Sequence, residues 1–185
     1  MQQKATIRKK VLARRKKKYF EISSQFFNPL IKILLKQKKI NTNILALYYP
    51  SNYEVNVLSL FKIIKKIKIK TLLPVIKSNN QMNFVEWKYL DPLVVNKFGM
   101  LEPGLSNKII SPDFMLVPLL AFDNKNNRLG YGKGFYDRFL NKFLKIKKKI
   151  TTIGVAFSFQ KYNKLPVSNL DIKLDYILTE KGLKK

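Results

Sequence analysis

The sequence predicts an α/β fold in which a single domain forms a three-layer sandwich around a mostly parallel, Rossmann-like sheet. Short apolar runs that are typical of strands buried on both faces alternate with segments in which apolar residues recur at helical spacing. The chain has 185 residues, of which 46% are hydrophobic, so it is long enough to bury one substantial core. Because no internal repeat or long linker interrupts this pattern, we expect residues 1–185 to form one domain.

The N-terminal part of the chain is expected to supply two helices before the sheet begins. Residues 4–20 and 23–39 both have helical spacing, and Pro29 predicts a bend or a late start in the second helix. Residues 43–49 form a continuous apolar run, which is typical of a buried strand. Residues 55–67 return to the helical period, so the alternation of strand and helix starts here.

The remaining elements continue this alternation, and glycine, proline and asparagine mark the breaks between them. In chain order we expect a strand over 71–76, an edge strand or strand and loop over 79–91, a loop over 97–107, the strongest core strand over 113–122, a helix over 134–146, a strand over 151–159 and a last strand over 175–179.

Two residue types that carry much of enzyme chemistry do not occur in the sequence. Without cysteine the chain has no disulfide and no thiolate nucleophile, which fits a reducing compartment. Without histidine it has neither a histidine base nor a histidine-ligated zinc site. A bound metal would need oxygen ligands, so Mg²⁺ is favoured over a transition metal.

The basic N-terminal segment is interpreted as a helix of the fold rather than as a targeting signal. Residues 1–20 are rich in Lys and Arg, but no apolar segment of about 7–15 residues follows them. No run of about 18 apolar residues occurs either, so no membrane span is expected. We therefore expect a cytoplasmic protein, and we expect it to be a monomer.

The net charge of +26 raises the alternative of a nucleic-acid-binding protein. However, 32 of the 37 basic residues are Lys and only 5 are Arg, whereas specific readers of bases and phosphates favour Arg. Lys, Ile and Asn all have A/T-rich codons, so an A/T-rich genome would raise their number in any protein. We expect most lysines to be solvated, with a diffuse attraction for anions and no specific nucleic-acid partner.

The stretch 128–140, RLGYGKGFYDRFL, contains three of the seven glycines of the chain within five positions. It matches neither the dinucleotide fingerprint G-x-G-x-x-G nor the P-loop G-x-x-x-x-G-K-[ST]. A phosphate cradle nevertheless needs only close backbone approach, inward N–H groups and a helix N-terminus, and the order strand, loop, glycines, helix offers these. Arg128 and Lys133 would add positive charge, and Asp137 could hold Mg²⁺. The alternative is an ordinary glycine-rich turn.

Residues 113–140, DFMLVPLLAFDNKNNRLGYGKGFYDRFL, closely resemble the signature of the 5-formyltetrahydrofolate cyclo-ligase family. That family's pattern ends in R-L-G-[RYF]-G-[GK]-G-Y-Y-D, and this chain keeps nearly all of it. Leu119 replaces a glycine, and Phe135 replaces the first tyrosine and loses its hydroxyl. The likeness extends over about residues 4–179, with Lys4 and Arg8 in a K-x-x-x-R opening.

The resemblance implies an α/β three-layer fold and the ATP- and Mg²⁺-dependent conversion of 5-formyltetrahydrofolate to 5,10-methenyltetrahydrofolate, ADP and phosphate. Lys133 and Arg128 would be catalytic, and Asp137 and Asp171 would hold Mg²⁺. Leu170 stands where the family usually has a histidine just before that second aspartate. The folate would contact Tyr49, Glu54, Glu102, Tyr131 and Phe135. The residues expected to bind ATP are Lys4, Arg8, Arg128, Leu129, Gly130, Tyr131, Gly132, Lys133, Gly134, Phe135 and Tyr136.

The resemblance leaves a second alternative, a paralogue that keeps the fold and has lost the activity. Retention of the basic and acidic positions of the motif argues against such decay. The proposed chemistry also suits this composition, because transfer of a phosphoryl group depends on positioning and on neutralised charge and needs no cysteine or histidine.

Overall fold

The computed structural model describes residues 2–36, 43–77, 81–104, 108–146 and 149–185. The expected helical end at 37–39, the expected strand start at 79–80 and the expected loop end at 105–107 lie outside the described residues. No helix in these ranges is both long enough and apolar enough to cross a membrane.

A sheet of seven strands forms the middle layer of the described chain, and its central strands are parallel, as predicted. The strands lie in the order β11-β10-β9-β6-β1-β2-β3. Only the two outer pairs, β2 with β3 and β10 with β11, are antiparallel. The bounds are β1 (Ile44–Ala46), β2 (Lys70–Ile76), β3 (Met82–Glu86), β6 (Phe114–Pro118), β9 (Thr151–Val155), β10 (Tyr176–Thr179) and β11 (Gly182–Lys184).

The five parallel strands, numbered as they occur in the chain, have the spatial order 2-1-3-4-5. This is the flavodoxin-like version of the doubly wound fold, whereas the Rossmann version has the order 3-2-1-4-5-6. The direction of winding reverses between β1 and β6. Ligands of open α/β sheets bind at the carboxyl ends of the strands at such a reversal, so the topology itself points to one place on the molecule.

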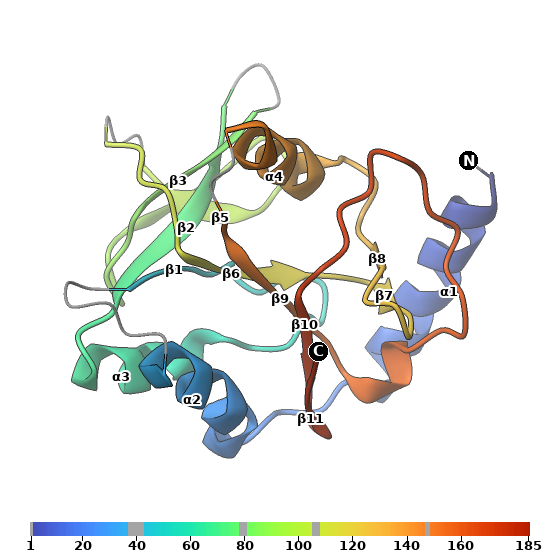
Figure 1. The fold of residues 1–185 in the computed structure, drawn as a ribbon, viewed down its shortest axis with the longest axis horizontal. Helices are drawn as coiled ribbons and strands as arrows, with labels where there is room; N and C mark the ends of the chain where they lie inside the picture. Colours follow the sequence, from blue (N-terminus) through green and yellow to red (C-terminus); the bar gives the residue numbers. More distant parts are fainter. Residues whose placement is uncertain (1, 37–42, 78–80, 105–107, 147–148) are drawn as a thin grey trace.

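Helices cover both faces of the sheet and complete the three layers (Figure 1). The helices α2 (Asn28–Lys36) and α3 (Leu58–Lys66) pack on one face, and α4 (Phe135–Lys145) packs on the other. The remaining helix, α1 (Gln2–Lys18), lies beside the short pair β7 (Ala121–Phe122) and β8 (Arg128–Leu129). The helix that contains Pro29 starts at Asn28, which confirms a late start, because proline is tolerated in a first helical turn.

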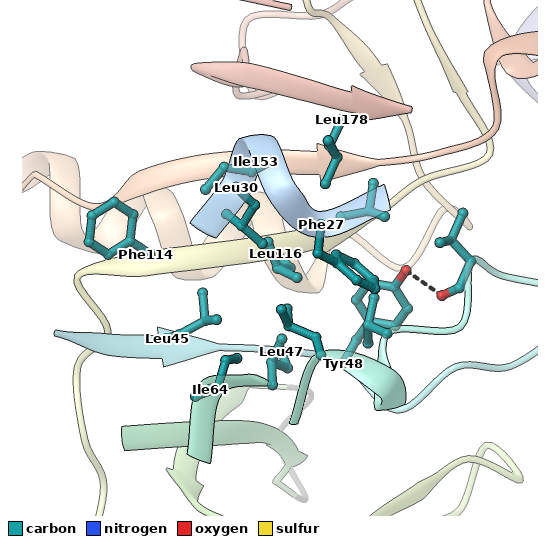
Figure 2. Packing of buried hydrophobic residues seen from close by; sticks show 14 of the residues in the cluster. Phe27, Leu30, Leu45, Leu47, Tyr48, Ile64, Phe114, Leu116, Ile153 and Leu178 are labelled. Carbon is teal, nitrogen blue, oxygen red and sulfur yellow. Dashed lines mark hydrogen bonds between the residues drawn. The ribbon is translucent and has the colours of Figure 1, made fainter. Parts of the chain in front are cut away.

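The core on the α2 and α3 face is a cluster of buried hydrophobic side chains. Figure 2 shows Phe27 and Leu30 of the N-terminal segment lying over Leu45, Leu116 and their neighbours from the central strands. Tyr48 joins this cluster through its ring and donates its hydroxyl hydrogen to the Val55 carbonyl at 2.8 Å. The β1 end is thereby tied to the chain that follows it, so the segment between Tyr48 and Val55 is anchored at both ends.

The predicted strand 113–122 is shorter than expected. The strand β6 ends at Pro118, and Ala121 already belongs to a separate hairpin with β8. The carbonyls of Leu119 and Leu120 accept hydrogen bonds from the buried Gln160 side chain instead of from a neighbouring strand. The apolar pattern could not reveal this exit, because both leucines remain buried after the backbone has left the sheet.

Two further strands correct the sequence prediction. The expected loop 97–107 contains β5 (Leu101–Pro103), which pairs with β4 (Leu93–Val95). Here Asn96 closes the turn by accepting the backbone N–H groups of Phe98 and Met100 at 2.9 and 3.1 Å. The loop signals therefore marked the tip of a hairpin and not its strands. The strand over 175–179 is likewise not the last, since β11 returns beside it.

Candidate active site

One cleft of about 360 Å³ lies where the winding of the sheet reverses, beyond the ends of β1 and β6. Tyr48 and Tyr49, which follow β1, and Pro118, which ends β6, all line it. Every residue that the sequence predicted for ATP, folate or metal also lines this cleft. The structure thus brings together positions from Lys4 to Asp171, although it assigns none of them a ligand.

The glycine stretch forms a tight loop between β8 and α4. Gly132 has a φ of +99° and Gly134 a φ of +67°, values that L side chains rarely adopt. A Cβ on Gly132 would also lie 3.1 Å from Cζ of Arg8. Arg8 donates from Nε to the Gly130 carbonyl at 2.9 Å, so a side chain of α1 stabilises the backbone of this loop. Gly132 and Gly134 are therefore required by the backbone conformation of the loop, as the clustering of glycines predicted.

The loop leads directly into the N-terminus of α4. Gly134 stands just before the first helical residue, Phe135, and the helix runs for 11 residues. The first N–H groups of a helix have no partner inside it and carry a partial positive charge, which makes such an end suitable for a phosphate. Lys133 and Arg8, which both line the cleft, add full positive charges at the same end.

Two ion pairs stand in the cleft beside this loop. Arg128 contacts Asp137 at 2.8 Å and also donates to the Ile172 carbonyl at 2.7 Å. Lys4 contacts Asp171 at 2.5 Å. Although burial alone favours the neutral acid, hydrogen bonds from Lys4 and from Ser168 hold the pKa of Asp171 below its ordinary value. The carboxylates and cations that are expected to bind the ligand thus form ion pairs with one another in the structure.

The aspartates suit Mg²⁺ in chemical type but do not form a complete cage. No group of three or more Asp and Glu residues that could hold a metal occurs in the described ranges. Mg²⁺ is commonly bound through one or two carboxylates together with substrate phosphates and water. Asp137 makes its contacts through its Oδ1 atom and Asp171 through its Oδ2 atom, so each has a second oxygen to offer. The donor set therefore fits a metal that arrives with a phosphate ligand.

Glu54, which contacts the glycine loop through Tyr131, is the most buried acid of the cleft. Its Oε1 atom accepts the Tyr131 hydroxyl at 2.6 Å, and its Oε2 atom accepts the Ser51 backbone N–H at 2.9 Å. Burial raises the pKa of the Glu54 carboxyl above its ordinary value, against the opposing effect of these hydrogen bonds and of the Arg15 charge. A carboxyl with a raised pKa in a cleft is a frequent mark of a functional site.

Glu102 lines the cleft from β5 and is held by its surroundings. Its Oε2 atom accepts the Ile76 backbone N–H at 3.0 Å and the Asn96 side-chain amide at 2.8 Å. This acid therefore joins the β4–β5 hairpin to the edge of β2. A structural role for Glu102 is evident, and contact with a substrate stays a prediction.

Besides the predicted Glu102, the β4–β5 hairpin contributes side chains to the cleft that sequence reasoning missed. Phe98 lies at its tip, with its ring centroid 5.4 Å from Nζ of Lys133 and 5.7 Å from the Phe135 ring. Asn96 and Met100 line the cleft beside it. A region marked only as a loop gave no reason to single out these side chains, because their position depends on pairing with a strand that was not foreseen.

Arg15 is a further residue that sequence reasoning missed. It is 1% exposed and contacts the Tyr131 hydroxyl, which itself contacts Glu54. The amino-acid composition could have drawn attention to Arg15. In a chain with 32 lysines, each of the 5 arginines stands out, and three of the others, Arg8, Arg128 and Arg138, lie in or against the glycine loop.

Comparisons with known proteins show which family the chain belongs to. Residues 1–180 match the sequence model of the 5-formyltetrahydrofolate cyclo-ligase family. The chain is 32% identical over 151 residues to 5-formyltetrahydrofolate cyclo-ligase of Haemophilus influenzae, which covers 78% of this chain and 79% of that protein. It is 34% identical over 137 residues to the enzyme of the same name from Mycoplasma pneumoniae, covering 74% of this chain and 72% of the other.

Solved structures show the same likeness in three dimensions. The 5,10-methenyltetrahydrofolate synthetase of Aquifex aeolicus has a TM-score of 0.74 and 32% identity, covering 98% of this chain and 92% of the other. The synthetase of Mycoplasma pneumoniae has a TM-score of 0.67 and 27% identity, covering 95% and 97%. On sequence, fold and cleft together, the chain belongs to the 5-formyltetrahydrofolate cyclo-ligase family.

Proposed function

We propose that this protein catalyses the ATP- and Mg²⁺-dependent cyclisation of 5-formyltetrahydrofolate to 5,10-methenyltetrahydrofolate, with release of ADP and phosphate. The observation that carries the proposal is that one cleft holds both a glycine loop with its cations and a buried carboxyl framed by aromatic rings. Membership of the cyclo-ligase family supports 5-formyltetrahydrofolate as the substrate, and the glycine loop with its cations supports ATP as the second one.

The glycine loop would receive the polyphosphate of ATP. Its positive φ angles and its position before α4 allow a phosphate to approach the backbone N–H groups closely. Lys133 and Arg128 would neutralise charge on the phosphoryl group in transit, and Lys4 and Arg8 would contact the nucleotide from α1. Leu129 and Tyr136 would line the same end.

The folate would occupy the end of the cleft near Glu54. This carboxyl would accept hydrogen bonds from the folate, because each of its oxygens can accept a second hydrogen bond beside the one that the protein donates to it. Tyr49, Tyr131 and Phe135 would frame the reacting region and exclude water from it. Glu102 would be a further carboxylate on the substrate side, held in place by the β2 edge.

The reaction needs a way to remove the formyl oxygen, which is a poor leaving group. In the proposed sequence this oxygen attacks the γ-phosphorus of ATP, and ADP departs. The N10 nitrogen then attacks the activated formyl carbon and loses its proton, and the carbon–oxygen bond breaks to release phosphate. No protein nucleophile takes part, which accords with a sequence without cysteine or histidine. The protein acts by positioning and by charge neutralisation.

Asp137 and Asp171 are the residues that would hold Mg²⁺ with the nucleotide phosphates. Bound there, the ion would neutralise charge on those phosphates. The nucleotide also supplies anions that can replace these aspartates as partners of Arg128 and Lys4. The two ion pairs of the structure would therefore be exchanged for contacts of the same kind with the ligand.

The direct test is turnover of 5-formyltetrahydrofolate by the purified protein, followed through the near-ultraviolet absorbance of the methenyl product. Product should form only when both ATP and Mg²⁺ are present, and ADP should appear in equal amount. Absence of product despite measurable ATP binding would overturn the proposal and would favour a paralogue that has lost the folate reaction.

A further inference from the structure

Arg15 is a charged residue in the protein interior, where an unpaired charge lowers the stability of the fold. Its side chain is 1% exposed, and among the described residues it has no carboxylate within salt-bridge distance. Its Nε atom is buried and has no hydrogen-bond partner in the part of the chain that the structure describes. A buried guanidinium with incomplete partners disfavours folding, so a role in stability alone gives a poor account of it.

The contacts that Arg15 does make converge on the surroundings of Glu54. Its Nη2 atom donates to the Tyr131 hydroxyl and, at 2.6 Å, to the Asn52 carbonyl. Its Nη1 atom donates to the Leu119 carbonyl at 3.3 Å. The guanidinium carbon also lies 5.5 Å from the centroid of the Tyr131 ring. One side chain of α1 therefore joins the glycine loop, the end of β6 and the turn after β1.

The contact with Tyr131 sets the direction of its hydroxyl. Because a guanidinium can only donate, the phenol oxygen must accept from Arg15. The single hydroxyl hydrogen is then free to point to Oε1 of Glu54, where a 2.6 Å hydrogen bond is seen. The order of donation is therefore Arg15 to Tyr131 to Glu54, and the positive charge is conveyed to the carboxyl through one tyrosine.

The contact with Asn52 holds the turn that carries Glu54. Asn52 and Tyr53 have φ angles of +48° and +59°, so two successive residues other than glycine adopt the left-handed conformation. Such backbone persists only where surrounding contacts impose it, and it gathers at functional sites. Arg15 donates a hydrogen bond to the Asn52 carbonyl, and the Glu54 carboxyl accepts the Ser51 backbone N–H within the same turn.

We propose that Arg15 is a positioning residue, which holds Tyr131 and the 51–54 turn in register so that the Glu54 carboxyl faces the substrate in the cleft. The inference rests on the proposed function for the identity of that substrate. Arg15 itself is absent from the described residues that line the cleft, so it acts through Tyr131 and Asn52 and not by touching the folate.

The chain provides a matched pair of arginines for the test. Arg15→Gln removes the buried charge and keeps a donor, whereas Arg14→Gln makes the same change at the next residue of α1. Arg14 is exposed and lies over the Phe159 ring, away from the cleft. We expect Arg15→Gln to lower kcat/KM for 5-formyltetrahydrofolate by roughly 10- to 100-fold, as misplacement of a site group does. KM for ATP should change less than about 3-fold, and Arg14→Gln should stay within about 2-fold of the unmodified protein in every constant.

A pH profile separates positioning from a general loss of structure. The charged and titratable groups that face Glu54 are Tyr48, Tyr131, Tyr136 and Arg15. Removing the Arg15 charge raises the pKa of the Glu54 carboxyl further, so the acid limb of kcat/KM should move to higher pH. Arg15→Lys keeps the charge and should keep that limb near its original position while recovering part of kcat/KM. A lowered melting temperature with unchanged kcat/KM and pH profile would overturn the proposal.

A measurement on the ligand-free protein keeps the proposal testable if Arg15→Gln does not fold or if the proposed reaction fails. With ¹³Cζ-labelled tyrosine, the resonance of Tyr131, assigned through Tyr131→Phe, should titrate with Glu54. Its midpoint should rise in Arg15→Gln, which removes the charge, and stay near its original value in Arg15→Lys, which keeps it. In Arg15→Lys the resonance itself should shift, because the group that donates to the Tyr131 hydroxyl has changed, whereas in Arg14→Gln both the shift and the midpoint should stay as they are. A Tyr131 resonance that ignores substitution at Arg15 would overturn the positioning role. Absence of methenyl product from the unmodified protein would instead count against the proposed function alone.

Discussion

At the scale of single residues, the position of the Lys133 ammonium leads to a prediction about catalysis. Its ammonium lies 5.4 Å from the centroid of the Phe98 ring, at the mouth of the glycine loop, where it can turn to a phosphate. We expect Lys133→Ala to lower kcat by about 100-fold or more, as removal of an electrostatic stabiliser does, with little loss of stability. Steady-state kinetics and thermal unfolding measure the two effects, and normal turnover would exclude the catalytic role.

The raised pKa of Glu54 makes a prediction about pH. In the proposed function the folate donates hydrogen bonds to Glu54, which only the carboxylate can accept through both oxygens, and burial favours the neutral acid. Because the pKa is raised, the carboxylate is lost on acidification at a higher pH than for an ordinary glutamate. The value of kcat/KM should therefore fall as pH decreases through that raised pKa. Glu54→Gln should have low activity that lacks this limb, and a limb retained in the glutamine variant would assign it to another group.

Leu119, where the family usually has glycine, is explained by the core. Its Cδ2 atom lies 2.7 Å from the position that a Cβ on Gly154 would occupy, so the leucine fills the space above this β9 glycine. Only its backbone carbonyl takes part in the contacts of Arg15 and Gln160. Leu119→Ala should therefore lower the free energy of unfolding by about 3 kcal/mol and leave kcat nearly unchanged. Denaturant unfolding measures the first, and a matching loss of kcat would implicate the side chain in the reaction.

At the scale of elements, the glycine loop provides an internal control for its own role. Gly132 has a positive φ and meets Arg8, whereas Gly130 has neither a positive φ nor any atom within 4 Å of the position that a Cβ would occupy. Gly132→Ala should lower stability by about 1–2 kcal/mol and weaken ATP binding. Gly130→Ala should leave stability unchanged and weaken ATP binding only if phosphate approaches the backbone there. Calorimetric titration with ATP and thermal unfolding distinguish the two, and equal behaviour of the variants would contradict the loop geometry.

The sequence predicted the elements that follow local rules and missed those that depend on distant partners. Helical spacing placed α4, and the apolar runs placed β1, β2, β6, β9 and β10 to within a few residues. The hairpin of β4 and β5 and the return strand β11 are held by pairing and turn contacts that short polar and mixed segments do not reveal. The fold class and the family are confirmed.

The same division holds within the cleft. The motif residues were recognisable because they form a contiguous pattern, and the topology does bring them to one edge of the sheet. Phe98 and Arg15 were not recognisable, because the position of Phe98 depends on an unforeseen hairpin and Arg15 contacts a tyrosine 116 positions away in the chain. The single-residue roles for ATP, folate and Mg²⁺ stay predictions until they are measured.

At the scale of the whole molecule, the net charge of +26 acts as a field that attracts polyanions. Acidic residues are few, and two of them are paired with cations in the cleft, so the ligand approaches a strongly positive protein. Screening by salt weakens such attraction between separated charges while leaving contacts inside a closed site largely intact. The charge should therefore affect capture of ATP more than the chemical step.

The dependence on salt distinguishes an enzyme from a nucleic-acid-binding protein in one experiment. Raising KCl from about 50 to 300 mM at constant free Mg²⁺ should increase KM for ATP severalfold and change kcat by less than about 2-fold. Binding of a fluorescent single-stranded RNA, measured by anisotropy, should disappear over the same range, because nonspecific phosphate contacts release counterions and weaken steeply with salt. RNA binding that survives physiological salt would mean that the lysine-rich surface has a partner of its own, since diffuse charge alone cannot sustain such affinity.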